Sequence, residues 1–306
     1  QIAGGYDIEC KKGMSLTHAC SYNQIEDIDL ISVCDPNNIV RNKFAKKWKI
    51  DKTYSDLENM LLHENLDIIS ICSPTEVHLD AFLKISKNPS IKGIFCEKPL
   101  SYDFIEAQKI AVLAGDKKVS LNYFRRWNPT LNKLREDLIN NKHGAIKHVT
   151  VNYTKGLLSN GSHLIDLLNW FFGAPTEVIK YNSYGDTKHD PGVDFKLRYN
   201  FGFEAVFLNI PDVSYTFIEL DIHTDVGKVS IKQRGQEIIY SEIITEPSYN
   251  TFNIVKQIKK INTQWQDCPT RAIRELIDAL NNDGQLSCSI KEGLMVSEIC
   301  NNILDS

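Results

Sequence analysis

The chain has 306 residues, of which 42% are hydrophobic and 24% charged, the balance of a folded globular protein rather than a disordered or fibrous one. This length suits two domains, each with its own core. The 35 basic and 39 acidic residues are interspersed and give a net charge of -4. No concentrated basic face is available to release counterions, which argues against nucleic acid as a partner.

Eight cysteines are scattered through the sequence without a C-x-x-C pair, and several lie in apolar runs, such as Cys72 and Cys96. We therefore expect reduced, buried cysteines rather than a disulfide framework, and no metal site. No apolar stretch approaches the roughly 18 to 20 residues of a membrane helix, and the first residues do not resemble a signal peptide. The expected location is cytoplasmic, without membrane contact.

From residue 29 to 123, short apolar runs alternate with segments of helical periodicity, which is typical of βα units that build a parallel sheet. The expected strands are 30–34, 68–72, 94–96 and 119–123. The expected helices are 40–48, 57–63, 77–87 and 104–115. This pattern predicts a doubly wound Rossmann domain over residues 1–123.

After a helix expected at 128–141, longer runs alternate in polarity and predict a largely antiparallel open sheet. The expected strands are 148–154, 177–182, 195–201, 204–210, 218–224 and 228–233. Further helices are expected at 162–172, 270–281 and 292–304. The fold class is therefore α/β, with a Rossmann domain followed by an α+β domain over 124–306, whose last helices can pack back on the first domain.

The first residues resemble the end of a Rossmann turn. In such a turn, G-x-G-x-x-G/A follows a strand, and backbone amides at the helix start face the pyrophosphate. Here Ile2 and Ala3 precede Gly4 and Gly5, with Ala3 in the position of the third glycine and the first strand absent. Both residues are candidate cofactor contacts. A flexible Gly-Gly terminus is the alternative.

Asp35 directly follows the strand expected at 30–34. An acidic side chain there can accept hydrogen bonds from the adenosine ribose and would repel a 2′-phosphate, which favours NAD over NADP. The distance from Ala3 exceeds the usual spacing of about 20 residues, so residues 6–17 are expected to be inserted before or within the first helix. The alternative is a turn and helix cap built by Asp35 and its neighbours.

A third candidate contact follows the strand expected at 68–72. Because ligands of open α/β sheets lie outside the carboxyl ends of the strands, Ser73, Pro74 and Thr75 are expected at the cofactor, with His78 close by. A plain strand-to-helix turn capped by Thr75 is the alternative.

The tripeptide Glu97-Lys98-Pro99 follows the strand expected at 94–96. A partly desolvated Lys98 near a cationic nicotinamide would have a lowered pKa and could act as a general base. Taken alone, the tripeptide also fits a surface ion pair before a turn.

Five motifs in this order together resemble the Gfo/Idh/MocA family of NAD(P)-dependent oxidoreductases, over essentially the whole chain. They are Asp35-Pro36, Cys72-Ser73-Pro74-Thr75 with His78, Glu97-Lys98-Pro99, Asn122 to Trp127, and Gly161-Ser162-His163 with Asp166.

The resemblance implies that Glu97 and Lys98 lie at the nicotinamide, with Lys98 as the catalytic residue beside the reacting hydroxyl. The family's H-x-x-D element maps onto His163 and Asp166, which implies that His163 contacts substrate. Many members carry an aspartate four residues before this histidine, whereas this chain has Ser159. That difference puts a strict Lys-Asp-His arrangement in doubt.

The remaining substrate candidates are polar or aromatic. His163 and Asp166 are three residues apart and therefore share one helix face. An arginine can clamp a carboxylate or phosphate, and an indole can stack on a sugar. The same residues would also suit interdomain packing. These further substrate candidates are Tyr123, Arg125, Arg126, Trp127 and Asn160.

The expected reaction is hydride transfer between NAD and a secondary alcohol or ketone of a sugar or nucleotide-sugar, with Lys98 and His163 as catalytic residues. Two alternatives stay open. One is a glycosidase that oxidises its substrate transiently with NAD, and the other is a redox-silent protein that binds NAD and sugar. The open sheet predicts a homo-oligomer, either a dimer or a tetramer.

Overall fold

The computed structural model describes the whole chain except residues 1, 8, 186–189 and 250. It contains two compact units. The first comprises Gln1–Trp127 and Gln266–Leu294, and the second comprises Asn128–Trp265 and Met295–Ser306. The first part of this unit thus ends at residue 127, where the sequence-based boundary is 123. Residues 266–294, which come after most of the second unit, also belong to it.

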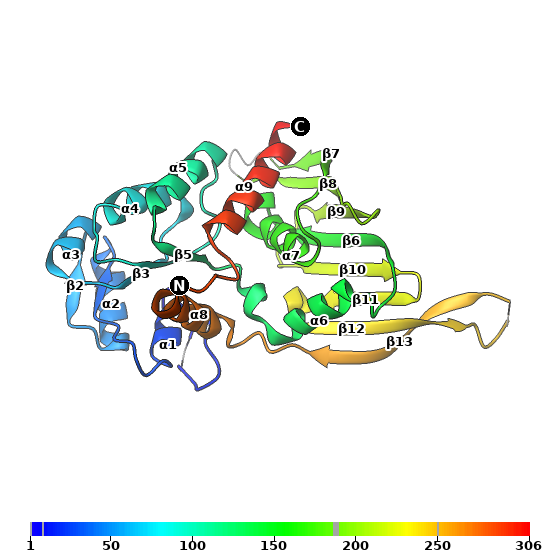
Figure 1. Cartoon of the computed structure of the whole chain (residues 1–306), viewed down its shortest axis with the longest axis horizontal. Coiled ribbons are helices and arrows are strands. Elements are labelled where there is room, and N and C mark those ends of the chain that lie inside the picture. Colours follow the sequence, from blue (N-terminus) through cyan, green and yellow to red (C-terminus); the bar gives the residue numbers. More distant parts are fainter. Residues whose placement is uncertain (1, 8, 186–189, 250) are drawn as a thin grey trace. The chain divides into compact units, whose positions relative to one another are not determined.

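The first unit holds two parallel sheets (Figure 1). One contains β3 (Ile68–Ile71), β4 (Gly93–Cys96) and β5 (Lys118–Leu121), and the other contains β1 (Ser32–Cys34) and β2 (Lys52–Tyr54). Its helices are α1 (His18–Tyr22), α2 (Asn38–Trp48), α3 (Leu57–His63), α4 (His78–Ile85), α5 (Phe104–Ala114) and α8 (Cys268–Asn282). This is the expected Rossmann architecture.

Burial and capping explain these elements. All four residues of β4 are buried, as in a parallel sheet that is covered on both faces. The side chains of Asn37, Asp56 and Asp103 accept backbone N–H groups at the starts of α2, α3 and α5. Each of these bonds satisfies donors that have no partner within the helix.

The strand register positions the candidate site. Ile71 pairs with Cys96, and Cys96 pairs with Leu121, so the three parallel strands end at one edge. The residues that directly follow them, Cys72, Glu97 and Asn122, therefore share that edge.

The second unit is built on an eight-stranded sheet in the order β13-β12-β11-β10-β6-β9-β8-β7, in which only β6 and β9 pair in parallel (Figure 1). Its strands are β6 (Ile146–Thr154), β7 (Glu177–Tyr184), β8 (Gly192–Arg198), β9 (Glu204–Ile210), β10 (Ile218–Thr224), β11 (Gly227–Lys232), β12 (Glu237–Thr245) and β13 (Asn253–Asn262). Its helices are α6 (Pro129–Ile139), α7 (Ser162–Phe172) and most of α9 (Ile290–Asp305). The sheet is largely antiparallel, as expected.

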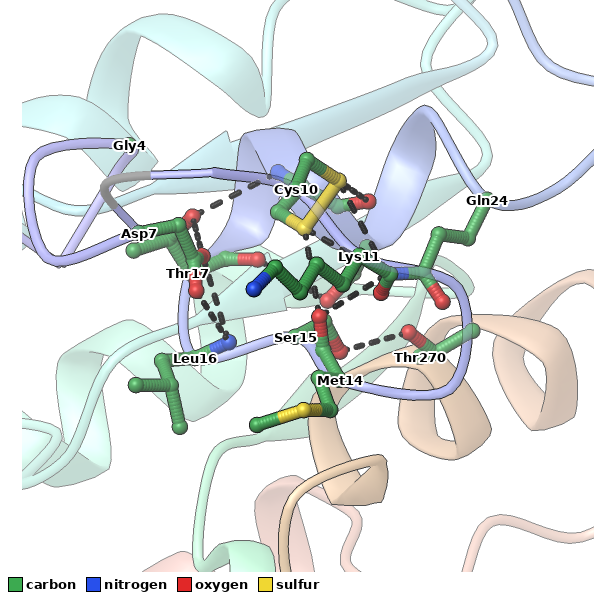
Figure 2. The surroundings of a disulfide bond; sticks show 12 residues. Gly4, Asp7, Cys10, Lys11, Met14, Ser15, Leu16, Thr17, Gln24 and Thr270 are labelled. Carbon is green, nitrogen blue, oxygen red and sulfur yellow. Dashed lines mark hydrogen bonds between the residues drawn. A yellow bond between two sulfur atoms is a disulfide. The ribbon is translucent and has the colours of Figure 1, made fainter.

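The cysteine prediction was wrong in one respect. Cys10 and Cys20 form a disulfide, with their Cα atoms 5.4 Å apart (Figure 2). The segment before α1 folds back on the helix and brings together two residues that are ten positions apart, which a search for C-x-x-C cannot detect. The six other cysteines are thiols rather than disulfides, and four of them are buried.

Within the described residues, no helix is both long and apolar enough to cross a bilayer.

Candidate active site

The carboxylate of Glu97 is the centre of a buried polar network at the carboxyl ends of the strands. Its Oε1 atom accepts hydrogen bonds from His18 Nε2 at 2.9 Å and from Asn122 Nδ2 at 2.7 Å. The Glu97 backbone N–H donates to Ile71 O at 2.9 Å. Glu97 is therefore fixed through both its side chain and its backbone, and the half-buried Lys98 follows it directly.

His18, the first residue of α1, is 2% exposed. Its second ring nitrogen, Nδ1, lies 3.0 Å from Ser70 Oγ, and that hydroxyl lies 2.7 Å from the hydroxyl of Tyr22. The ring also packs on Phe95, with 4.4 Å between the ring centroids. Both nitrogens of the imidazole thus have hydrogen-bond partners, and the partner of Nε2 is a carboxylate.

Electrostatics indicate an ion pair between His18 and Glu97. Burial alone would lower the pKa of His18, but its interactions with Cys72 and Glu97 raise that pKa to about 10. Burial likewise acts to raise the pKa of Glu97, but the opposing interactions with His18, Asn122 and Lys98 leave it lowered. We therefore assign a cationic His18 and an anionic Glu97 at neutral pH.

Asp35 lies half-buried, immediately after β1. Its Oδ1 atom accepts the backbone N–H of Asn37 at 2.8 Å, and Asn37 in turn caps α2. Arg41 Nη1 donates to the backbone carbonyl of Asp35 at 2.6 Å. The cap itself is thus provided by Asn37, while the Asp35 carboxylate lies at a strand end, where an adenosine ribose would bind.

The segment Ser73 to Thr75 follows β3. Ser73 is half-buried, Pro74 is exposed and Thr75 is buried, and no side chain caps the short helical turn Thr75–Val77. His78 is fully buried, with Nδ1 3.1 Å from Leu100 O and Nε2 3.2 Å from Ser73 O. Through these two hydrogen bonds, the His78 side chain connects the loop after β3 to the segment after Pro99.

Ile2 and Ala3 lie beside the start of α1. Ile2 O accepts the N–H of His18 at 3.3 Å, and Ala3 O accepts the N–H of Ala19 at 2.8 Å. Ala3 does not stand directly before a helix, because α1 begins at His18. These two residues thus present carbonyl oxygens to the helix start, rather than the amides expected for pyrophosphate binding.

The turn that enters α1 is instead formed by residues 10–17. Asp7 carboxylate oxygens accept hydrogen bonds from Leu16 N at 3.1 Å and from Thr17 Oγ1 at 2.5 Å (Figure 2). Ser15 Oγ lies 2.6 Å from Thr270 Oγ1 of α8, within the same unit (Figure 2). The turn is therefore held by side chains as well as by the disulfide.

Tyr123, Arg125, Arg126 and Trp127 are all buried in the first unit. Arg126 Nη1 donates to Ser287 O at 2.8 Å, and Trp127 Nε1 donates to Glu275 Oε2 at 2.9 Å. The Arg125 guanidinium lies over the ring of Phe124, 4.7 Å from its centroid. For Arg126 and Trp127 these contacts support the packing alternative, although within one unit rather than between domains.

In the second unit, His163 and Asp166 lie on the first turns of α7, with His163 half-buried and Asp166 buried. Asn160 belongs to the π-helical segment Leu157–Gly161 and donates through Nδ2 to Thr154 O at 2.8 Å.

Position 159 does not carry the family's common aspartate, but another carboxylate lies next to it. Asp190 Oδ1 accepts the N–H of Leu158 at 2.6 Å, and Asp190 Oδ2 accepts the N–H of Ser159 at 3.1 Å. Pro191 O accepts the N–H of Leu157 at 2.8 Å. The segment that leads into α7 is thus held by residues 190 and 191.

A cavity of about 360 Å³ in the second unit lies apart from these residues. Its lining includes Lys133, Asp137, His143, Lys228 and Tyr240, and none of the candidate site residues.

Among the residues of these networks, the sequence-based assignment missed His18, Asn122 and Asp190. A spacing signal was available for His18. Counting back the usual ~20 residues from the ribose-binding acid at Asp35 leads to Ser15, just before α1, and not to Ala3. No local pattern marks Asp190, whose partners are more than 30 residues away.

The arrangement fits a nicotinamide cofactor, because polar side chains follow the parallel strands β1, β3 and β4, at Asp35, Ser73 and Glu97 with Lys98. A Rossmann fold with polar residues at this edge is typical of NAD(P)-dependent dehydrogenases and reductases. Residues 13–124 match the Gfo/Idh/MocA model, described as an oxidoreductase family with an NAD-binding Rossmann fold. This part of the first unit is therefore similar to that family.

Solved structures with the same fold cover the chain almost completely. The WlbA dehydrogenase from Bordetella pertussis, in complex with NADH and UDP-GlcNAcA, is 17% identical with a TM-score of 0.75, and the match covers 94% of this chain and 91% of that chain. UDP-N-acetylglucosamine 3-dehydrogenase GnnA from Acidithiobacillus ferrooxidans is 16% identical with a TM-score of 0.74, at 94% and 91% coverage. An oxidoreductase from Agrobacterium radiobacter, in complex with NAD+, L-tartaric acid and magnesium, is 13% identical with a TM-score of 0.75, at 94% and 92% coverage. Comparison with curated protein sequences gives no match.

Proposed function

We propose that the protein transfers a hydride between NAD and a secondary alcohol or ketone of a sugar or nucleotide-sugar. The observation that carries this proposal is the half-buried Lys98 at the carboxyl end of β4, directly after the fixed carboxylate of Glu97. NAD, when bound, supplies the hydride acceptor of the oxidation. The protein must then bind the sugar, orient it and remove the hydroxyl proton.

In this proposal Lys98 takes the proton from the reacting hydroxyl, and His163 contributes from the second unit by bonding a sugar hydroxyl. A lysine that is partly removed from water suits proton acceptance, since burial disfavours its charged form. The other substrate contacts are Tyr123, Arg125, Asn160 and Asp166, with Arg126 and Trp127 acting through packing. Glu97, Ser73, Pro74 and Thr75 would line the cofactor, with Ile2, Ala3 and His78 supporting it through the backbone.

The substrate class is supported by two of the structures that share the fold, one named for UDP-N-acetylglucosamine and one in complex with UDP-GlcNAcA. NAD is favoured over NADP by the carboxylate of Asp35. A homo-oligomer, a cytoplasmic location and a substrate-binding role for the second unit are predictions from the sequence.

The experiment is turnover of D-glucose, myo-inositol and UDP-N-acetylglucosamine with NAD, followed by NADH absorbance, in wild type and Lys98→Ala. We expect Lys98→Ala to bind NAD within about threefold of wild type and to lose about 10²- to 10⁴-fold in kcat. Lys92 directly precedes β4, at the opposite end of the same strand, so Lys92→Ala is the matched control and should keep its activity. Near-normal turnover by Lys98→Ala would refute the role of Lys98.

A redox-silent protein that binds NAD and sugar is the second candidate. Ser159 in place of the common aspartate favours it, as do the Ile2 and Ala3 carbonyls that occupy the first amides of α1. Calorimetric binding of NAD and UDP-N-acetylglucosamine, without hydride exchange across the sugar panel, would identify this function.

A further inference from the structure

His18 has no part in the proposed chemistry, yet it is the charged partner of the tripeptide. Asn122 donates a hydrogen bond to Glu97 but cannot carry a charge. The ring of His18, which can, has its Nε2 atom 2.9 Å from the same carboxylate oxygen. The exposed fractions of the two ion-pair side chains are 3% for His18 and 15% for Glu97. A carboxylate buried to this degree is costly without an opposite charge.

The ring of His18 cannot turn away from Glu97 without losing other contacts. Nδ1 is held at Ser70, one face packs on Phe95, and the backbone is the first turn of α1. Ser70 is itself engaged by Tyr22, one turn further along the same helix. The imidazole is therefore fixed in place, and it holds Glu97 on the side of α1.

Glu97 transmits this constraint to the catalytic position. Its backbone is bonded to β3, its side chain is bonded to α1 and to the residue after β5, and Lys98 is the next residue in the chain. The charge of Lys98 contributes to the lowered pKa of Glu97, so the two side chains interact electrostatically. A cation at His18 offsets the negative charge of Glu97.

We propose that His18 is a positioning residue for Lys98: through Glu97 it fixes the strand end that carries the lysine and balances the charge beside it. The inference rests on the proposed function of Lys98. It also connects the turn that enters α1, where a Rossmann cofactor is bound, to the catalytic tripeptide. The titratable and charged groups facing the pair are Tyr22, Cys72, His78, Cys96 and Lys98.

The test is a double-mutant cycle of His18→Gln and Glu97→Gln, with the best substrate of the sugar panel. Glutamine at position 18 can still donate a hydrogen bond, but it cannot carry a charge. We expect each single variant to lose about 10- to 100-fold in kcat, because the lysine is misplaced or its surroundings are altered. If His18 acts through Glu97, the loss of kcat in the double variant should be no larger than the loss in the less active of the two single variants.

The pH profile distinguishes positioning from a merely structural role. In His18→Gln the unbalanced carboxylate favours protonated Lys98, so the acidic limb of kcat for alcohol oxidation should move to higher pH. Tyr22→Phe is the control, since it removes a hydroxyl from the same network without touching Glu97, and it should leave that limb unchanged. Additive losses in the cycle together with an unmoved limb would overturn the proposal.

A measurement on folded wild-type protein needs neither turnover nor a stable His18 variant. We expect the imidazole NMR signals of His18 to be those of the cation up to pH 8 in wild type, and to change to those of the neutral ring at a lower pH in Glu97→Gln than in wild type. A neutral His18 in wild type at pH 7 would refute the ion pair. An active Lys98→Ala would instead refute the proposed function, whatever the state of His18.

Discussion

The carboxylate of Asp190 accepts the backbone N–H of Ser159, with 3.1 Å between Oδ2 and N. Position 159 is where many family members carry an aspartate, so this chain brings a carboxylate to the same stretch of backbone from a residue 31 positions later. Both of its oxygens bond amides just before α7, the helix that carries His163. Asp190 therefore holds the segment that places a candidate substrate residue.

Gly156 gives a direct test of this contact. A Cβ atom built at Gly156 would lie 2.0 Å from Asp190 Cγ, so an alanine there must displace the carboxylate from both amides. We expect Gly156→Ala to lower the free energy of unfolding by about 1–3 kcal/mol, since the amides of Leu158 and Ser159 lose their charged acceptor. Chemical denaturation in urea measures the difference.

The matched control is Gly284→Ala. Its added Cβ would make only ordinary contacts of 3.4 Å or more. We expect a change below about 0.5 kcal/mol at this position. Equal effects of the two substitutions would show that the Asp190 carboxylate does not determine the cost at Gly156.

The His18–Glu97 ion pair predicts that stability falls as the pH rises above neutrality. The pKa of His18 is about 10 in the folded protein against 6.5 for the free side chain, so folded protein retains a proton that unfolded protein releases. The stabilisation is fully present below pH 6.5 and is lost between 6.5 and about 10, with a slope of at most about 1.4 kcal/mol per pH unit. Glu97, whose pKa is lowered, contributes above its ordinary value of 4.5 and loses this contribution on acidification.

Urea unfolding at a series of pH values from 6 to 10 measures this slope. His18→Gln should be less stable than wild type at pH 6.5, and the difference should shrink as the pH approaches 10. Parallel curves for the two proteins would contradict the ion pair, because the slope would then arise from other groups.

Periodicity was sufficient to predict the fold, because the spacing of apolar residues within each helix or strand is visible in the local sequence. The ranges of α3, α7, β9 and β10 match the expected ones to the residue. The hairpin of β12 and β13 was missed because β13 is an edge strand that is mostly exposed and carries lysines at 256, 259 and 260, so its apolar alternation is weak.

The site was predictable only where it follows strand ends. Glu97 and Asp35 stand directly after apolar runs, which is a local signal. The partners of Glu97 come from positions 18 and 122, and the contacts of Arg126 and Trp127 come from residues 287 and 275. Such pairs depend on tertiary packing, for which a single sequence carries no pattern.

The Cys10–Cys20 disulfide predicts a measurable thiol count. Alkylation of unfolded, unreduced protein should modify six cysteines, and reduction should add the remaining two of the eight. Cys10→Ser should lower the free energy of unfolding by about 2–3 kcal/mol, because the unfolded chain gains conformational entropy when a loop of this length is no longer closed. Cys34→Ser, at a free and half-buried cysteine, is the control with a smaller expected effect. Eight modified cysteines before reduction would contradict the disulfide.

Asp35 predicts the choice between the two nicotinamide cofactors. Asp35→Asn keeps the Oδ1 acceptor for the amide of Asn37 but removes the charge that would repel a 2′-phosphate. Arg41, held 2.6 Å from the backbone carbonyl of Asp35, then keeps its positive charge at the strand end while the charge of Asp35 is gone. We expect the ratio of kcat/KM for NADP to that for NAD to rise about tenfold or more, equivalent to about 1.4 kcal/mol.

Initial rates with both cofactors and the same sugar give this ratio, and Asp80→Asn on the surface of α4 is a control that should leave it unchanged. A second variant, Asp35→Asn with Arg41→Ala, separates the two contributions: the gain for NADP should shrink if the guanidinium attracts the phosphate, and persist if lost repulsion alone explains it. An unchanged ratio in Asp35→Asn would mean that the end of β1 does not face the adenosine ribose, and would remove Asp35 from the cofactor site.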